Sequence, residues 1–520
     1  MGTYFNPPNK NFSEAAGFDY YVDKSGILGE LNKMVETPEK YVCVSRPRRF
    51  GKTITANMLS AYYNRMRDSA GLFAGLAIAH DPSYESYLNK FHVIFLDIGK
   101  LLSRSGVGDM IDKLDKTLTR EIQRVYPDIP RDADMTLPDY INELYEVTGI
   151  GMVIIIDEWD CIFRERKDDT AAHGEYLKFL REFLKDQPYI SLVYMTGILP
   201  IKKYGSHSAL GMFHEFSMTE PKQFDRFIGF NADEVRSLCD RYGMDFLEMA
   251  AWYDGYSFPH APSVFNPRAV VAAFLTGSFS SYWTQTETFE ALKAYILMDY
   301  DGLGESVVSL LAGGKVRIKT DGFTNDMVTF QSKDDVLTLL VHLGYLGYLA
   351  DSSEVFVPNK EISKEFVTAM GSPRYQGVTR TVNVSSDLLK ATWSKDSGTV
   401  ASLLEKAHEE TSHLTYNDEN ALAYTVSLAY LSAKDYYTVV REMPSGKVFA
   451  DLIFLPMKSH LDKPAMVVEL KWNKTAEGAI KQIKEKNYPA VLKDQAGKIL
   501  LVGINYAQST KKHSCVIEEI

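Results

Sequence analysis

A segment close to the N-terminus contains the residue types that bind phosphate groups. In YVCVSRPRRFGKTITANMLSAYY, an apolar run leads through a short loop into a helical pattern. Gly51 lets the main chain turn closely around a phosphate, and the helix after it directs free N–H groups and its positive dipole end toward that phosphate. Lys52 is placed to reach the β- and γ-phosphates, and Thr53 to offer a hydroxyl to Mg²⁺. The segment therefore predicts an ATP-binding loop.

The loop departs from the common pattern GxxxxGK[ST] at its first position, where Arg46 replaces glycine. Pro47 is expected to fix the course of the loop instead. The residues predicted to surround the nucleotide are Arg46, Pro47, Arg48, Arg49, Phe50, Gly51, Lys52 and Thr53. Because surface loops contain GKT by chance, the prediction also depends on residues further along the chain.

Two acids stand at the end of an apolar run, MVIIIDEWD, about 100 residues downstream. Asp157 is expected to hold Mg²⁺, and Glu158 to orient or polarise the attacking water. A further run, SLVYMTGI, leads to Thr196, which could sense the γ-phosphate or be purely structural. Alone, the acidic pair is equally well explained as a solvated strand end. Its order and separation from the loop favour an ATPase.

A second group of chemical interest lies near the C-terminus. Asp451 lies in KVFADLIFLP, and eighteen residues later MVVELKW contains Glu469 and Lys471. The period of a strand places Glu469 and Lys471 on one face and Val468 on the other. Asp451 and Glu469 could hold Mg²⁺ for phosphodiester cleavage while Lys471 steers or activates the water. An isolated ExK on a strand is more often a solvated face.

The elements that must position these residues alternate between short apolar runs and helical stretches. The predicted strands of the first 200 residues are 41–45, 92–97, 152–157 and 191–196. Helical patterns lie near 53–67, 108–125 and 175–184. Runs that are apolar almost throughout are typical of strands buried on both faces, so the fold class predicted here is α/β with a parallel sheet.

The rest of the chain divides into a middle region and a C-terminal domain. Residues 333–343 read as a helix, followed by two short strands around the turn at 351–353, which suggests a winged-helix-like unit. A Ser-, Gly- and Arg-rich stretch, 371–386, is expected to be a loop at a domain boundary. The predicted domains are 1–220, a helical and winged-helix-like lid over 221–375, and an α/β domain over 385–520.

Composition narrows the setting. No apolar run is long enough for a membrane span, and the four cysteines form no CxxC pair, so a cytoplasmic protein is expected. The formal net charge of −11 argues against a broad nucleic-acid-coating surface. Residues 471–498, however, contain seven lysines and only three acids. A solvated helix face explains such a run more often than a basic groove does, but a basic groove remains an alternative interpretation.

The N-terminal motifs resemble a known family. YYVDKSGIL, SRPRRFGKT, FLDIG and IIIDEWD together are similar to the bacterial predicted AAA-ATPase-like family, over about residues 12–221. In that family RPRRFGKT itself lacks the first glycine. The resemblance implies a P-loop NTPase fold, places Asp23 and Lys24 near the nucleotide, and makes Asp160 a supporting acid.

The C-terminal motifs, over about residues 404–504, resemble the PD-(D/E)xK nuclease superfamily, whose fold is that of the restriction endonucleases. The resemblance makes Glu419 the helix acid, Asp451 with Glu469-x-Lys471 the core, and Gln482 a helix residue of the site.

Together these features predict an ATP- and Mg²⁺-dependent nuclease, suited to defence against mobile DNA. Nucleic acid, DNA rather than RNA, is the expected partner, and assembly into a homo-oligomer is left as an alternative. The alternatives are an ATPase switch whose C-terminal domain binds nucleic acid or protein without cutting, and a loop that binds nucleotide with negligible hydrolysis. The sequence does not distinguish an arginine finger among Arg164, Arg166 and Arg226.

Overall fold

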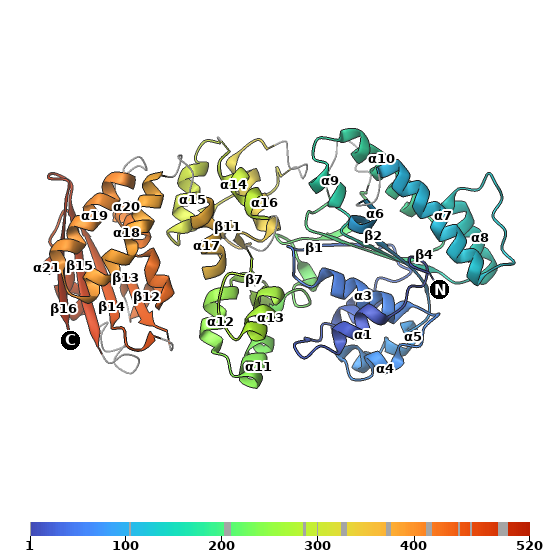
Figure 1. The fold of residues 1–520 in the computed structure, drawn as a ribbon, viewed down its shortest axis with the longest axis horizontal. Coiled ribbons are helices and arrows are strands. Elements are labelled where there is room, and N and C mark those ends of the chain that lie inside the picture. The colour runs from blue at the N-terminus through green and yellow to red at the C-terminus, as the bar shows by residue number, and fades with distance from the viewer. Residues whose placement is uncertain are drawn as a thin grey trace. The chain divides into compact units, whose positions relative to one another are not determined.

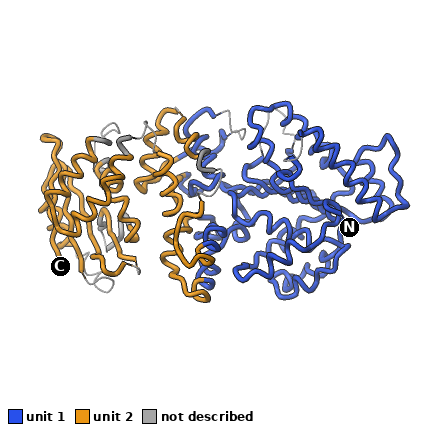
Figure 2. The backbone as a smooth tube through the Cα atoms, viewed as in Figure 1, with its two compact units in different colours: residues 1–238, 256–272, 318–353 blue, residues 239–255, 273–317, 354–520 orange. Residues whose placement is uncertain are grey.

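The computed structural model describes residues 2–102, 106–201, 210–283, 288–298, 300–323, 330–370, 376–411, 419–445, 448–457, 460–486 and 498–520. The chain forms two compact units, which Figure 2 shows in different colours. Unit 1 contains residues 1–238, 256–272 and 318–353, and unit 2 contains residues 239–255, 273–317 and 354–520. The middle region of the chain is thus shared between the units.

Unit 1 is built on a five-stranded parallel sheet with the order β2-β3-β4-β1-β5. Its strands are β1 (Tyr41–Ser45), β2 (His92–Asp97), β3 (Met152–Asp157), β4 (Ile190–Gly197) and β5 (His214–Phe216). The predicted parallel sheet is confirmed, and the first four strands coincide with the predicted ones to within a residue. The short strand β5 was missed because its three residues run from exposed to buried and carry no apolar pattern.

Helices cover both faces of this sheet (Figure 1). One face is covered by α3 (Lys52–Tyr63) and α1 (Lys10–Ala16), the other by α7 (Val107–Val125), α8 (Leu137–Thr148) and α10 (Thr170–Leu184). Helix α7 buries Met110, Leu114, Leu118 and Ile122, which recur every four residues on one face. These side chains pack with Ile154 and other residues of the sheet in one hydrophobic core.

Unit 1 also contains a small antiparallel sheet and a helix from the middle of the chain. The sheet has the order β6-β8-β7, with β6 (Phe230–Asn231), β7 (Tyr256–Phe258) and β8 (Ala261–Phe265). The predicted helix at 333–343 is α16 (Lys333–Leu343), and β10 (Gly347–Leu349) follows it. Ser332 and Asp335 form a capping box at the start of α16, and Gly344 ends it with a φ of 86°.

The C-terminal part of unit 2 is a mixed five-stranded sheet with the order β12-β13-β14-β15-β16. The strands are β12 (Tyr437–Ser445), β13 (Val448–Pro456), β14 (Ala465–Trp472), β15 (Ile499–Ala507) and β16 (Lys512–Glu519). Only β14 and β15 pair in parallel, and the connection between them contains α21 (Ala476–Glu485). One face packs on α18 (Gln376–Trp393), α19 (Ser397–Thr411) and α20 (Glu419–Ala429), and α21 covers the other.

The structure corrects the prediction of a loop over residues 371–386. Residues 376–386 belong to α18, and residues 371–375 lie outside the described part of the chain. In the part of α18 that was expected as a loop, the described buried side chains are those of Thr381 and Ser385, which the sequence presents as loop composition. The Ser385 hydroxyl accepts the Ser432 N–H at 2.8 Å, and Thr392 hydrogen-bonds the Tyr430 hydroxyl at 2.7 Å. Because these hydroxyls find partners, they can lie in the core.

The N-terminal segment of unit 1 is held by one buried carboxylate, Glu121. It accepts the N–H groups of Thr3, Tyr4 and Phe5, the last at 2.9 Å. Hydrogen bonds to a charged acceptor contribute about 1.5–3 kcal/mol each. We expect Glu121→Gln to raise the hydrogen-exchange rates of residues 3–6 at least about tenfold. Unchanged rates, relative to the exposed control Glu182→Gln, would contradict this assignment.

Candidate nucleotide and nuclease sites

The phosphate-binding segment connects β1 to α3. Two residues in it adopt left-handed backbone conformations, Arg49 with a φ of 70° and Gly51 with a φ of 88°. Gly51 precedes α3 and has no side chain that could cap the first N–H groups of the helix. The loop and the helix start therefore present the main-chain donors that bind a phosphate.

Lys52, the first residue of α3, is held by the loop itself. Its Nζ donates to the carbonyl oxygens of Arg46 at 3.0 Å and Pro47 at 2.8 Å. Burial lowers the pKa of Lys52, and the nearby carboxylates of Glu158 and Asp157 counteract this. A phosphate entering the loop could replace the two carbonyls as the partner of this ammonium group.

Asp157 lies at the end of β3, close to the start of α3. It is 1% exposed, accepts a hydrogen bond from the Thr53 side chain, and its Oδ1 accepts the Glu158 N–H at 3.1 Å. Burial raises the pKa of Asp157 to about 6, partly offset by Thr53 and Lys52. A carboxylate and a hydroxyl that already touch are oxygen ligands of the kind Mg²⁺ takes in phosphoryl-transfer sites, so these residues fit that ion.

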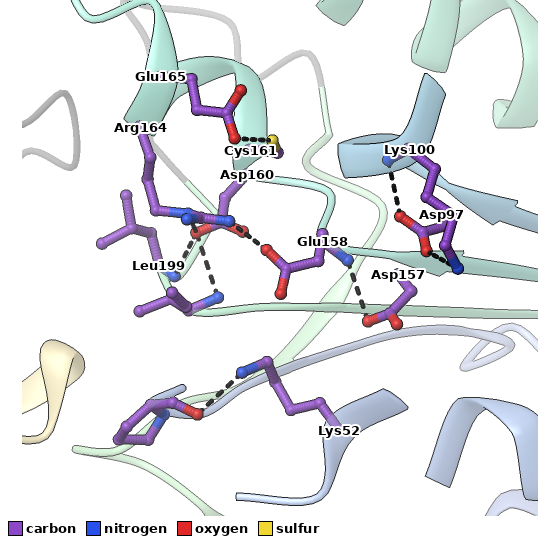
Figure 3. A network of polar contacts seen from close by, with 12 residues as sticks. Lys52, Asp97, Lys100, Asp157, Glu158, Asp160, Cys161, Arg164, Glu165 and Leu199 are labelled. Atoms are coloured by element: carbon purple, nitrogen blue, oxygen red, sulfur yellow. Dashed lines mark hydrogen bonds and ion pairs between the residues drawn. The ribbon is translucent and has the colours of Figure 1, made fainter. Parts of the chain in front are cut away.

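Glu158 belongs to a network of charges that includes Asp160 and Arg164 (Figure 3). Glu158 has a φ of 57°, and its carboxylate accepts a hydrogen bond from the Arg164 guanidinium. Arg164 Nε also donates to Asp160 Oδ2 at 3.0 Å. The same Asp160 oxygen accepts the N–H groups of Ile198 at 3.1 Å and Leu199 at 2.9 Å. Asp160 thus fixes both the segment after β4 and the arginine that orients Glu158.

A cavity of about 790 Å³ lies over the phosphate loop. The predicted residues that line it are Arg48, Arg49, Phe50, Gly51, Lys52, Thr53 and Glu158. Arg46, Pro47, Asp157 and Thr196 do not belong to the described lining. The Thr196 hydroxyl donates to the Val44 carbonyl at 2.9 Å, joining β4 to β1. The side chain of Arg46 is fully buried, which corrects the expectation that it would face the nucleotide.

Three residues that composition and spacing alone did not place at the nucleotide line the cavity. Arg164, one of three arginines that the sequence did not distinguish, lines the cavity, whereas Arg166 and Arg226 do not belong to the described lining. Lys24, placed near the nucleotide by resemblance, also lines it and bonds both carboxylate oxygens of Glu234 at 2.7 Å. Arg268 completes this set. No sequence spacing links these residues to the loop, so Arg164 and Arg268 are identified by the contacts of the fold, whereas Lys24 was also expected there from the resemblance.

The second candidate site lies on the face of the C-terminal sheet that α21 covers. Alternation along β14 places Met466, Val468 and Leu470 in the core beneath the other helices, and Glu469 and Lys471 on the α21 face. The antiparallel register pairs Leu452 with Val468, beside Asp451 and Glu469, and the Asp451 carboxylate is close enough to raise the pKa of Glu469. The predicted side chains therefore meet on one face.

Glu469 is the centre of this site. Its Oε1 accepts hydrogen bonds from Gln482 and from Lys471 at 3.1 Å, and Lys486 Nζ lies 3.8 Å away. Its Oε2 is buried and has no hydrogen-bond partner in the described part of the chain. Burial raises the pKa of Glu469, and the neighbouring Asp451 raises it further, while Lys471 lowers it. An unsatisfied buried carboxylate oxygen beside a second carboxylate fits a divalent cation.

Asp451 also has a structural bond, since its Oδ2 accepts the Leu470 N–H at 2.7 Å. The side chain of Glu419, the expected helix acid, lies outside the described part of the chain. Among the described residues, no three His, Cys, Asp or Glu side chains gather as a metal-binding group. In the described part of the site, Asp451 and Glu469 are therefore the carboxylates that could hold an ion.

None of the described helices has the length and apolar character needed to cross a membrane.

These observations define the class of protein. A parallel sheet whose strand β1 leads through a phosphate loop into a helix, with an acidic pair at the end of β3, is a P-loop NTPase domain. The C-terminal mixed sheet with its Asp451, Glu469 and Lys471 group is an α/β domain of the nuclease type.

Comparison with known families agrees with this class. Residues 10–206 match the family described as Predicted AAA-ATPase, and residues 417–516 match the PD-(D/E)XK nuclease superfamily. The chain thus joins a domain of the predicted AAA-ATPase family to a C-terminal domain of the PD-(D/E)XK nuclease superfamily, which confirms both resemblances.

Two solved structures from Aeropyrum pernix are similar to this chain. The ORC2 protein, solved as ADPNP–ADP complexes, has 12% identity and a TM-score of 0.30 over 69% of this chain and 92% of that chain. The ORC1 protein in complex with DNA has 11% identity and a TM-score of 0.23 over 85% of this chain and 90% of that chain. A search among curated proteins found no match.

The raised pKa of Asp157 predicts a pH-dependent cost to stability. An unfolded aspartate titrates near pH 4, whereas the pKa is about 6 in the fold. The folded state therefore binds the proton more tightly, and the free energy of unfolding falls as the pH rises from about 4 to above 6. Asp157→Asn removes this cost, so we expect unit 1 to gain up to about 3 kcal/mol at pH 7 and nothing near pH 4.

Thermal unfolding between pH 4 and pH 8, in EDTA and without nucleotide, measures this difference. Asp128→Asn, at an exposed position, is the matched control. A variant that is less stable than wild type at pH 7, or a gain that does not change with pH, would show that the Asp157 carboxylate is not destabilised by its site.

Proposed function

We propose that unit 1 binds ATP and hydrolyses it in the cavity over the phosphate loop. The observation that carries this proposal is the meeting of Lys52, Thr53 and Glu158 at one cavity, with Asp157 bonded to Thr53. A cavity of about 790 Å³ is in the range of small-molecule sites. Thr53 and Asp157 would hold Mg²⁺, which neutralises charge on the β- and γ-phosphates when bound.

The residues of the chain divide the remaining work. Lys52 exchanges its bonds to the carbonyls of Arg46 and Pro47 for bonds to the nucleotide phosphates. The N–H groups around Gly51 bind the phosphate oxygens. Glu158 orients the attacking water, and its direction is set by Arg164, which is itself held by Asp160. Thr196 contributes by fixing β4 to β1, since its hydroxyl is already bonded.

We further propose that the C-terminal domain cleaves nucleic acid, with DNA as the expected substrate. The supporting observation is the buried Oε2 of Glu469, which has no partner among the described residues while Oε1 accepts Gln482 and Lys471. Asp451 and Glu469 would hold Mg²⁺, which activates water for phosphodiester cleavage when bound. Lys471 is placed to hold that water or the phosphate. A nuclease controlled by ATP would suit defence against mobile DNA.

The four cysteines are free, and three of them are buried. Free thiols persist in a reducing compartment, so we propose that these reactions take place in the cytoplasm.

ATP turnover tests the first proposal. Lys52→Ala should abolish detectable nucleotide binding, because it removes the ammonium group that the loop holds at the start of α3 for the phosphates. Glu158→Gln should retain binding and lower turnover on the order of a hundredfold or more, the usual contribution of a positioned base. Lys178→Ala, on the exposed side of α10, is the control. Equal turnover in all of these proteins and wild type would defeat the ATPase assignment.

Cleavage of plasmid and single-stranded DNA in Mg²⁺ tests the second proposal. Glu469→Gln and Asp451→Asn should each lower cleavage about a hundredfold or more, because each removes a negative ligand. The exposed Glu485→Gln is the matched control, and ATP turnover should stay unchanged in all three variants. Cleavage by the Glu469 and Asp451 variants at the wild-type rate would refute the nuclease site. Absence of cleavage by wild type would favour a domain that binds without cutting.

A further inference from the structure

The side chain of Arg46 turns away from the nucleotide cavity and into the interior of unit 1. It is fully buried, and its Nη1 donates to the carbonyl oxygens of Ser45 at 2.7 Å and Phe216 at 2.9 Å. Its guanidinium carbon lies 5.7 Å from the centre of the Phe258 ring, in β7. The residue that replaces the first glycine of the common loop therefore joins that loop to β5 and β7.

Burial of the Arg46 guanidinium costs free energy. Nε and Nη2 of Arg46 have no hydrogen-bond partner among the described residues. Burial lowers the pKa of Arg46 to about 10, so the group remains charged at neutral pH. A buried charge with incomplete hydrogen bonding costs free energy, and an apolar side chain of similar volume would avoid that cost. Stability alone therefore does not explain an arginine here.

Phe50 makes a second connection from the same loop to the same strand. Its ring packs edge to face on Tyr256 of β7, with the ring centres 5.2 Å apart at an angle of 83°. The Tyr256 hydroxyl donates to the carbonyl of Gly344 at 2.6 Å. Gly344 is the residue that ends α16. A continuous set of contacts thus runs from the loop through β7 to the end of α16, all within unit 1.

Lys52 bonds the loop at the main chain of the same arginine. Its ammonium group donates to the Arg46 and Pro47 carbonyls, and a phosphate that binds this group competes with them for its three N–H donors. Nucleotide binding therefore acts directly on the backbone of the residue whose side chain lies against β7.

We propose that Arg46 and Phe50 transmit the nucleotide state of the phosphate loop to β7 and the end of α16. This inference rests on the proposed binding of ATP by the same loop. Arg46 is a positioning residue, because it touches β5 and β7 rather than the nucleotide cavity. The two segments that receive the change are residues 256–258 and 340–346.

Hydrogen exchange of full-length protein, with and without a non-hydrolysable ATP analogue and Mg²⁺, tests this transmission. In wild type we expect the analogue to change exchange at least about threefold in both segments. Arg46→Gly restores the glycine of an ordinary phosphate loop. It should still bind the analogue, but the exchange change in both segments should be smaller than in wild type, because only the connection through Phe50 remains. Arg67→Gly removes another guanidinium, whose Nε and Nη2 are buried without a hydrogen-bond partner among the described residues. Arg67 does not belong to the described cavity lining, and this variant should behave as wild type.

Tyr256→Phe keeps the aromatic ring but removes the bond to Gly344, so it tests the path with little effect on folding. This variant should keep the change at residues 256–258 and lose it at residues 340–346. The inference is overturned if Arg46→Gly responds to the analogue as wild type does, or if wild type binds the analogue without a change in either segment. Failure of wild type to bind the analogue would overturn the proposed ATP site as well.

Discussion

The parallel register of β1, β3 and β4 is the constraint on which the nucleotide site depends. Pairing of Ser45 with Gly197 and of Asp157 with Thr196 brings the carboxyl ends of three strands to one edge of the sheet. The loop after β1 and the acids after β3 then meet although they lie far apart in the sequence. A shift of one residue in β3 would turn Asp157 to the opposite face.

The alternation of side chains between the two faces of a strand also organises the C-terminal site. Alternation along β14 gives one face to the core and leaves Glu469 and Lys471 beneath α21, where Gln482 reaches them. In both sites the fold keeps a carboxylate buried with a raised pKa, Asp157 in one and Glu469 in the other. Such groups are unfavourable for stability and favourable for binding a cation, which is the pattern expected of functional residues.

Strand periodicity and loop chemistry made much of this predictable. The apolar runs gave the four longer strands of the parallel sheet, and the position of Lys52 after Gly51 gave the loop. Contacts between distant segments were not predictable, because they depend on how the sheet folds back on its helices. The sequence therefore does not distinguish Arg164 from other arginines, whereas in the structure Arg164 is held by Asp160. Likewise, loop residues were expected to face the nucleotide, whereas the side chain of Arg46 is buried against Phe216 and Phe258.

The proposed function is a coupling of ATP to cleavage of nucleic acid within one chain. Its most direct test is the rate at which wild-type protein cleaves plasmid DNA in Mg²⁺, measured with ATP, with a non-hydrolysable analogue and without nucleotide. We predict that cleavage with ATP is at least about tenfold faster than without nucleotide, a coupling of ordinary size between two sites. Cleavage at the same rate in all three conditions would contradict the account.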